Sequence, residues 1–246
     1  MRCSRIHIDA ELAPHVEVPL TPERSHYVRN VLRLKDGDSI HVFNGHEDLA
    51  YSARLLIAGK KVSAVLGETL PSTNSSPAHI TLLQAVGKSE QMDLVVQKTT
   101  ELGIDRLVFF NSQRTQSPIK GSRLQKRLMH WHAVAVSACE QCGRNRLPQM
   151  EFSQDMSHCL RLIEPTKNRL LLDFDSPSFK QLKNTFTTSP PFYVMIGPEG
   201  GFATQEITLA KAHDFQACQL GPRTLRMETA AIVATALLQL EFGDLG

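Results

Sequence analysis

Apolar and polar positions alternate in short runs through about the first 70 residues, a pattern that predicts β-strands. The expected strands are His41–Phe43, Tyr51–Ile57 and Val62–Leu66. Turn signals such as Asn44-Gly45 separate them, and the spacing predicts a small β-barrel. Between Glu23 and Leu34 the apolar positions fall at helical spacing, so one short helix is expected against the barrel.

The stretch from Pro71 to Pro77 is polar and has little to bury, as is typical of a linker. Beyond it, apolar runs of strand length alternate with helix-like segments. The expected strands are Ile80–Val86, Leu107–Phe110, Arg169–Asp173, Phe192–Ile196 and Cys218–Leu220. This alternation predicts an α/β domain with a parallel sheet. We therefore expect two domains, 1–72 and 73–246.

Two helices can be predicted with their buried faces. Arg123–Glu140 places its apolar side chains on one stripe, so one side should pack and the other should be solvated. Met227–Phe242 is apolar on nearly every side. A helix of that kind must be covered all round, which places it in the interior of the second domain.

Composition adds few constraints. A chain of 246 residues with 41% hydrophobic content can bury two modest cores, and a formal net charge of +2 does not indicate a polyanionic partner. No apolar run is long enough to span a membrane, and no signal peptide is visible. Five irregularly spaced cysteines argue against a disulfide framework, so a reducing cytoplasm is expected.

Familiar cofactor and metal motifs are missing. Neither a Gly-x-Gly-x-x-Gly turn nor a complete P-loop is present, since Gly87-Lys88-Ser89 lacks the earlier glycine. Cys139 and Cys142 are spaced as metal ligands, but no second pair accompanies them, and helical packing is the favoured interpretation. We expect no metal.

Between Arg106 and Cys139 the chain carries six basic residues and no acidic one. A solvated helix face is the ordinary explanation for such a cluster, and phosphate contact is the functional one. Because no acidic residue is interleaved, the sequence leaves these two interpretations about even.

Two unusual turns follow strand-like runs and together suggest one ligand site. Gly197–Phe202 interrupts an apolar run, and its glycines would let a ligand approach backbone amides, while Thr204 is expected to cap the next helix. Leu220–Ala230 leads into the last helix, with Arg226 and Glu228 at its mouth. For Arg226 an ion pair and a ligand role are equally supported; for Glu228 a favourable interaction with the helix dipole leads.

Several motifs, in order and at fitting distances, resemble the RsmE-type ribosomal RNA methyltransferases of the knotted SPOUT superfamily. The resemblance extends to the N-terminal segments Arg2–Arg5 and His26–Arg33. The main matching motifs are Gly87–Asp93, Gln97–Gly103, Glu140–Arg144, Ile196–Phe202 and Leu220–Ala230.

The resemblance implies a PUA-like β-barrel followed by a knotted α/β methyltransferase domain with a parallel sheet. It also implies a homodimer that uses S-adenosylmethionine. The implied reaction is methylation at N3 of one uridine near the 3′ end of 16S rRNA in the 30S subunit. Ribose 2′-O-methylation and a non-catalytic role in ribosome assembly remain the alternatives.

The resemblance also implies site residues. Arg226 is expected to stabilise charge on the reacting base. Arg5 is a second candidate for this role, within one subunit or across the dimer. Glu228 is expected to accept the proton or to hold Arg226. The implied cofactor-binding residues are Leu171, Leu172, Asp173, Ile196, Gly197, Pro198, Glu199, Gly200, Gly201, Leu220, Gly221, Leu225, Arg226, Met227, Glu228 and Thr229. The RNA-binding candidates are Arg2, Arg5, Arg29, Arg33, Arg114, Arg123, Lys126, Arg127 and Arg144.

Overall fold

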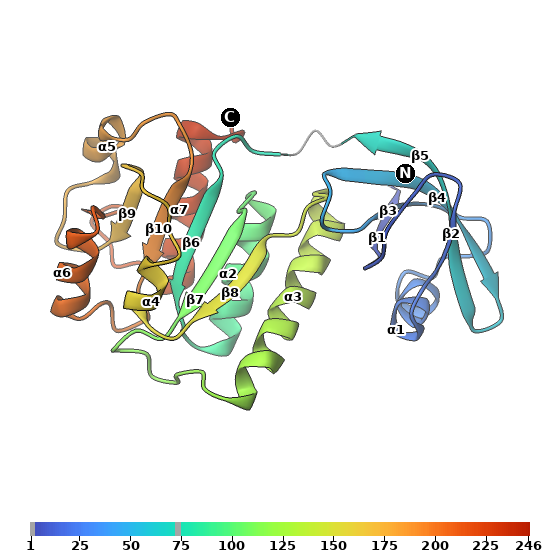
Figure 1. Ribbon diagram of the computed structural model, residues 1–246, viewed down its shortest axis with the longest axis horizontal. Helices are drawn as coiled ribbons and strands as arrows, with labels where there is room; N and C mark the ends of the chain where they lie inside the picture. The colour runs from blue at the N-terminus through green and yellow to red at the C-terminus, as the bar shows by residue number, and fades with distance from the viewer. Residues whose placement is uncertain (1–2, 72–74) are drawn as a thin grey trace. The chain divides into compact units, whose positions relative to one another are not determined.

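The structure is a computed structural model that describes residues 3–71 and 75–246. These residues form two compact units (Figure 1). The chain divides between Ser75 and Ser76, and the segment Cys139–Leu147 belongs with the first unit. The expected division into 1–72 and 73–246 places Cys139–Leu147 in the second domain, whereas this segment belongs with the first unit.

The first unit is built on a five-stranded sheet in the order β1-β3-β4-β5-β2. Its strands are β1 (Ser4–His7), β2 (Glu17–Pro19), β3 (Ser39–Phe43), β4 (Leu49–Ala58) and β5 (Lys61–Pro71). The two longest, β4 and β5, form an antiparallel hairpin whose turn contains Gly59 at a φ of 63°, where glycine is favoured. One face of the sheet buries a core that includes Ile6, Val42 and Leu55.

The expected short helix is present but irregular. The helix α1 (Pro22–His26) begins with Thr21, whose hydroxyl accepts from the Arg24 amide at 3.3 Å. It continues directly into a π-helical turn, Tyr27–Val31, in which Val28 is fully buried. Arg33 follows with a φ of 56°.

The segment Cys139–Leu147 completes the core of the first unit. Cys139 is buried with Phe43 and Ala50, and the Leu147 amide donates to the Gly45 carbonyl at 2.9 Å. Glu140 accepts from the His7 amide at 2.9 Å and is also paired with Arg24. Residues distant in sequence therefore stabilise the N-terminal sheet.

The second unit contains a six-stranded sheet in the order β11-β9-β10-β6-β7-β8, with every pair parallel, which confirms the expected α/β class. The strands are β6 (Ile80–Ala85), β7 (Arg106–Phe110), β8 (Gln149–Ser153), β9 (Arg169–Leu172), β10 (Phe192–Ile196) and β11 (Gln216–Cys218). All residues of β6 and β10 are buried, because helices cover both faces of the sheet.

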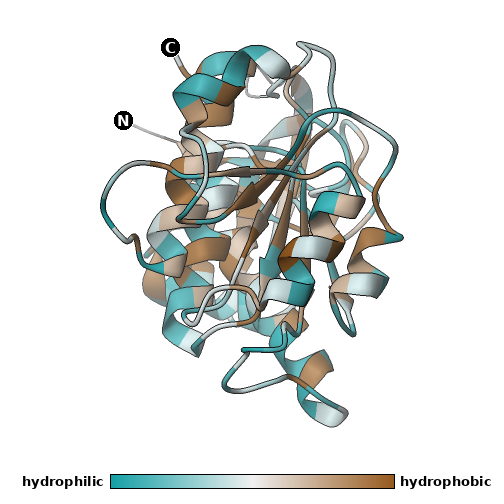
Figure 2. Cartoon of the chain, turned by 90° about the vertical axis from the view of Figure 1, so that its left-hand side faces the viewer, coloured by the Kyte–Doolittle hydropathy of each residue, from teal (hydrophilic) through white to brown (hydrophobic). Residues whose placement is uncertain are grey.

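The helices of this unit form two layers around the sheet. They are α2 (Ser89–Glu101), α3 (Ser122–Cys142), α4 (Met156–Leu160), α5 (Phe179–Leu182), the 3-10 turn Lys183–Thr185, α6 (Thr204–Ala212) and α7 (Met227–Phe242). Side chains of α2, α3 and α7 pack on one face, and those of α4 and α6 on the other. Figure 2 shows the apolar strands passing between these helices. None of the helices within the described residues has the length and apolarity that a bilayer crossing requires.

The limits of some elements differ from the sequence expectations. The strand β8 was not predicted, and β11 lies two residues earlier than expected, so Gln219 and Leu220 are already in a loop. Thr204 is not the cap of α6 but its first residue; Ala203 precedes it with extended backbone angles. The expected span Met227–Phe242 coincides with α7.

Candidate active site

The carboxyl ends of three adjacent parallel strands form the floor of a cavity of about 690 Å³ in the second unit. Leu172 lies opposite Cys218 in the pairing of β9 with β11, and Ile196 ends β10 beside them. The Asp173 amide donates to the Cys218 carbonyl at 2.9 Å, which holds the strand ends together just below the cavity. Ligands of open α/β sheets bind at this edge.

The loop after β10 forms one wall. The Gly201 amide donates to the Pro198 carbonyl at 2.8 Å and closes a tight turn in which Gly201 has a φ of 67°. A Cβ added at Gly197 would lie 3.3 Å from the Gly201 carbonyl carbon. The turn therefore needs both glycines, one for its backbone angle and one for its close packing.

The opposite wall is the segment that leads into α7. Arg226 is exposed and occupies the N-cap position of the helix, whereas Glu228 in its first turn is only 7% exposed. Met227 packs against Gly87, where an added Cβ would lie 2.7 Å from the Met227 sulfur. Packing therefore fixes Met227 at the start of α7, while the neighbouring Arg226 lines the cavity.

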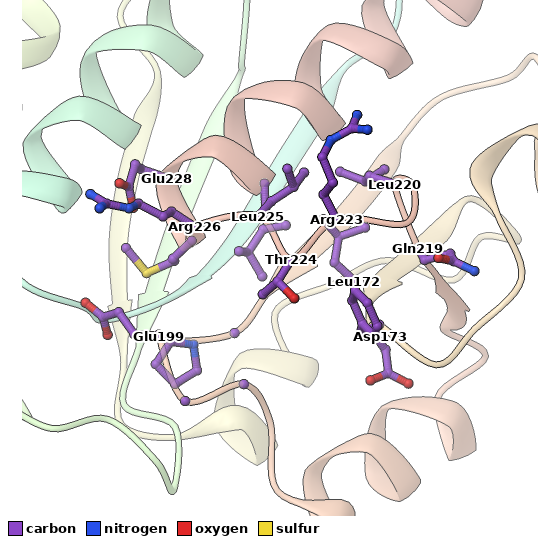
Figure 3. A pocket seen from close by; sticks show the side chains of 18 of the residues that line it. Leu172, Asp173, Glu199, Gln219, Leu220, Arg223, Thr224, Leu225, Arg226 and Glu228 are labelled. Carbon is purple, nitrogen blue, oxygen red and sulfur yellow. The ribbon is translucent and has the colours of Figure 1, made fainter.

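Charged side chains surround the cavity. Figure 3 shows Arg226 and Glu228 extending to the same side, with Asp173 at the far side. Asp173 accepts from the Ser176 hydroxyl at 3.0 Å, and Glu199 accepts from the Lys88 amide at 2.9 Å. The site therefore offers both carboxylates and guanidinium groups around an apolar floor.

The glycine loop is supported from outside the cavity by Glu206. This carboxylate is 4% exposed and accepts from the Ala203 amide at 2.9 Å, the Ser112 hydroxyl at 2.9 Å and the Gln113 amide at 3.0 Å. Arg114 then donates to the Gly200 carbonyl at 3.0 Å. The loop after β7 and the loop after β10 are therefore joined at several points.

Most residues expected to bind a cofactor line this cavity. Two do not: Leu171 is fully buried in the core on the α4/α6 face of the sheet, and Thr229 is absent from the lining. Arg223 and Thr224 also line it, within the segment Leu220–Glu228 that the resemblance implies as a cofactor loop. Sequence reasoning missed further lining residues, namely Lys88, Gln91, Phe174, Cys218, Gln219 and Ala230. The signal for Lys88 and Gln91 was available, because both belong to the Gly87–Asp93 motif.

Two candidate RNA-binding arginines are engaged within the first unit. Arg5 donates to the Arg144 carbonyl at 3.0 Å and lies over the Phe43 ring at 4.9 Å. Arg144 itself is only 9% exposed. Both positions therefore have structural contacts that the sequence did not indicate. Arg2 lies outside the described residues.

The basic cluster between Arg106 and Cys139 is less uniform than its sequence. Arg106 forms an ion pair with Glu151 at 2.9 Å, and Arg127 is hydrogen-bonded to the Ser89 hydroxyl. Arg114 donates to the Gly200 carbonyl. Arg123 and Lys126 are exposed on α3, and in the first unit Arg33 is exposed and Arg29 half-buried. The exposed members remain the stronger candidates for phosphate contact.

Three of the five cysteines, Cys139, Cys159 and Cys218, are buried thiols. A hydrogen bond with Cys142, together with burial, raises the pKa of Cys139. Burial alone raises the pKa of Cys218, on the cavity floor, to about 12, so it stays a protonated thiol near neutral pH. Within residues 3–71 and 75–246, no three His, Cys, Asp or Glu side chains are grouped as metal ligands.

Comparison with known families defines the class of the protein. Residues 74–239 match the RNA methyltransferase domain, and residues 20–64 match the RNA methyltransferase PUA domain. Two curated relatives from Buchnera aphidicola are both ribosomal RNA small subunit methyltransferase E. The relative from the Acyrthosiphon pisum subspecies is 30% identical over 98% of this chain and 94% of its own length. The relative from the Schizaphis graminum subspecies is 31% identical over 99% and 98%. The chain belongs to the ribosomal RNA small subunit methyltransferase E family.

Solved structures match over the full length. A methyltransferase from Legionella pneumophila, solved with bound cofactor SAM, is 34% identical with a TM-score of 0.92, covering 100% of both chains. Ribosomal RNA small subunit methyltransferase E from Neisseria gonorrhoeae, bound to S-adenosyl methionine, is 30% identical with a TM-score of 0.89 and the same coverage. These matches confirm the two-part architecture of a PUA-like module and an α/β methyltransferase domain.

Proposed function

We propose that this protein transfers a methyl group from S-adenosylmethionine to N3 of a uridine near the 3′ end of 16S rRNA in the 30S subunit. One observation carries the proposal: the cavity at the ends of β9, β10 and β11 is walled by two glycine-containing loops, in a chain whose relatives of known structure bind this cofactor.

The lining of the cavity fits this cofactor. Its volume of about 690 Å³ lies in the usual range for small-molecule sites, roughly 300 to 1,000 Å³. Leu172, Ile196 and Leu225 offer an apolar surface for the adenine ring. Asp173 and Glu199 can accept hydrogen bonds from ribose hydroxyls or the ammonium group, and Arg223 can pair with the carboxylate.

The donor, when bound, supplies an electrophilic methyl group on a sulfonium. N3 of uracil carries a proton that must leave before this nitrogen can accept the methyl, and negative charge then spreads onto the two flanking oxygens. Arg226 presents its guanidinium at the helix mouth, where it stabilises that charge. Glu228, nearly buried beside it, takes the proton or fixes the position of Arg226.

The cofactor assignments form part of the proposal. Leu172, Asp173, the loop Gly197–Gly201 and the segment Leu220–Glu228 contact the donor. We extend the proposal to two properties that the family resemblance implies: a trefoil knot formed by these loops and a homodimer. Sedimentation of the purified protein at several concentrations tests the dimer, and a single monomeric species throughout would contradict it.

The function is tested by supplying labelled S-adenosylmethionine with unmodified 30S subunits, and separately with naked 16S rRNA and with tRNA. Nucleoside mass spectrometry then identifies the product. We expect 3-methyluridine from 30S subunits. Label in a 2′-O-methyl nucleoside would replace the chemistry and keep the cofactor site, and a protein that binds no cofactor would instead support a role in ribosome assembly.

A further inference from the structure

A second cavity, of about 670 Å³, lies in the methyltransferase unit and has no part in the function proposed above. It is found at the carboxyl ends of β7 and β8, on the same edge of the parallel sheet as the first cavity. The loop from β7 to α3 forms most of its wall, and Figure 1 shows this loop below the carboxyl ends of the strands. Its volume again suits a small ligand or one nucleotide.

The wall of this cavity is organised by hydrogen bonds. The side-chain amide of Asn111 donates to the backbone carbonyl of Ile119 and accepts from the backbone amide of Ile119, both at 3.0 Å. These two bonds close the loop at its base. Thr115 accepts from the Ser112 amide at 3.0 Å and donates to the Val86 carbonyl at 3.2 Å. A loop fixed in this way presents a preformed surface, so little ordering is needed when a ligand binds.

The groups facing this cavity suit a nucleobase. Phe152 is half-buried and offers an aromatic ring, and the side chains of Gln113 and Gln154 are exposed amides that can both donate and accept. Unpaired RNA bases are recognised by stacking on aromatic rings and by hydrogen bonds to their edges. Among the described residues, Glu206 accepts from the backbone amide of Gln113 and no hydrogen bond engages its side chain, so the side-chain amide can bond a base.

The charged side chains at the cavity favour the base of a nucleotide inside it and the phosphate outside it. Asp155 lines the cavity as a carboxylate whose pKa is lowered by hydrogen bonds from His158. A phosphate would be repelled there, whereas the N–H groups of a base would not. Lys120 lines the cavity and Arg123 follows in the first turn of α3, a turn without acidic residues. These cations suit the phosphate of a nucleotide whose base enters the cavity.

A single partition separates the two cavities. Gly200 lines the first, Ser112 and Gln113 line the second, and the contacts of Glu206 and Arg114 join these segments. We propose that the second cavity is a subsite for an unpaired nucleotide of the substrate RNA, flanking the nucleotide held at the first cavity. This inference rests on the proposed function for the nature of the substrate.

The test measures RNA binding directly, with the full-length protein and a fluorescein-labelled single-stranded RNA that contains the methylation site. The double variant Gln113→Ala, Gln154→Ala should raise the Kd for this RNA roughly tenfold. Its Kd for S-adenosylmethionine should stay unchanged. Gln116→Ala is the matched control, because Gln116 is exposed on the same loop but does not line the cavity.

Wild-type RNA affinity in the double variant would overturn the subsite, as would an equal loss in Gln116→Ala. Failure of the proposed function gives a different result. If the wild-type protein binds the RNA but transfers no methyl group to any RNA, the reaction is wrong while the comparison of Kd values still decides the subsite. A wild-type protein that binds neither this RNA nor 30S subunits would overturn both; if it binds only 30S subunits, the same comparison of Kd values is made with them.

Discussion

At the scale of single residues, Arg226 carries the chemical proposal. It occupies the N-cap position of α7 and is exposed at the cavity, so its guanidinium is not held by the packing that fixes Met227 beside it. An interaction used mainly in the transition state should affect the rate more than the binding of the donor.

We expect Arg226→Ala to lower kcat for methyl transfer by about 100-fold or more, as when one transition-state donor is removed. The Kd for S-adenosylmethionine, measured by calorimetry, should change much less. Arg226→Lys is the matched variant, and it should recover part of the rate because it keeps the charge. An equal loss of rate and donor affinity in Arg226→Ala would contradict the catalytic role.

Glu206 is a second residue with a measurable role. Its buried carboxylate accepts three hydrogen bonds, and a glutamine would direct an N–H group at one of these donors. We expect Glu206→Gln to lower the free energy of unfolding by about 1 to 3 kcal/mol and to weaken donor binding. Chemical denaturation and calorimetry measure the two effects. Glu90→Gln, at an exposed position in the first turn of α2, should change neither.

At the scale of elements, the sequence predicted best those whose pattern has only one structural solution. β6 and β10 are continuous apolar runs, so each had to be buried on both faces. The limits of the helix Met227–Phe242 were also predicted, but the expectation that it is covered all round is wrong: its buried residues follow one stripe, and Leu240 is 56% exposed. The strand β8 escaped because Gln149–Ser153 is only partly buried at the edge of the sheet. Its pattern resembles a loop, and only pairing with β7 makes it a strand.

The basic cluster illustrates a limit of the same kind. The sequence shows a row of cations with no acidic neighbour, but Glu151, distant in sequence, neutralises Arg106. The pattern of charges along one segment contains no information about such a partner. Exposure on α3, which only the structure provides, separates Arg123 and Lys126 from Arg127, which is half-buried on the same helix and bonded to Ser89.

We therefore expect the double variant Arg123→Ala, Lys126→Ala to weaken RNA binding and to reduce the slope of log Kd against log salt by about 1 to 2. Binding of labelled RNA between low and moderate salt measures this slope. Lys167→Ala, Lys180→Ala is a charge-matched control at two exposed positions away from α3. An unchanged slope would mean that Arg123 and Lys126 make no phosphate contact and belong to an ordinary solvated helix face.

At the scale of the whole molecule, the two-part organisation was visible from the change in rhythm near Pro71, but the membership of Cys139–Leu147 was not. A helical stripe predicts that one side of α3 is buried, without saying against what. Cys139 packs with Phe43 and Ala50, residues about 90 to 100 positions earlier in the chain. Long-range packing of this kind leaves no local signal in a single sequence.

The contacts of Glu140 make this membership testable. Glu140 accepts from the His7 amide and pairs with Arg24, whose pKa is lowered by burial. We expect Glu140→Ala to lower the free energy of unfolding by about 3 kcal/mol, because it leaves a partly buried arginine without its carboxylate. Glu241→Ala removes the more exposed pair with Lys183 and should cost at most about 1 kcal/mol.

Denaturant unfolding of both variants provides the comparison. The fluorescence of Trp131, in the second unit, and far-ultraviolet circular dichroism should be followed together. Equal destabilisation by the two substitutions would mean that Cys139–Leu147 contributes no more than a surface ion pair does.

The late position of Cys139–Leu147 also has a consequence for biosynthesis. A ribosome adds roughly 5 to 20 residues per second, and Leu147 emerges about 70 residues after Ser75. During those several seconds the N-terminal strands are made, but Phe43 and Ala50 still lack Cys139. The first unit therefore cannot complete its folding in the order of translation. A nascent chain released at residue 75 should be more sensitive to protease than one released after residue 147.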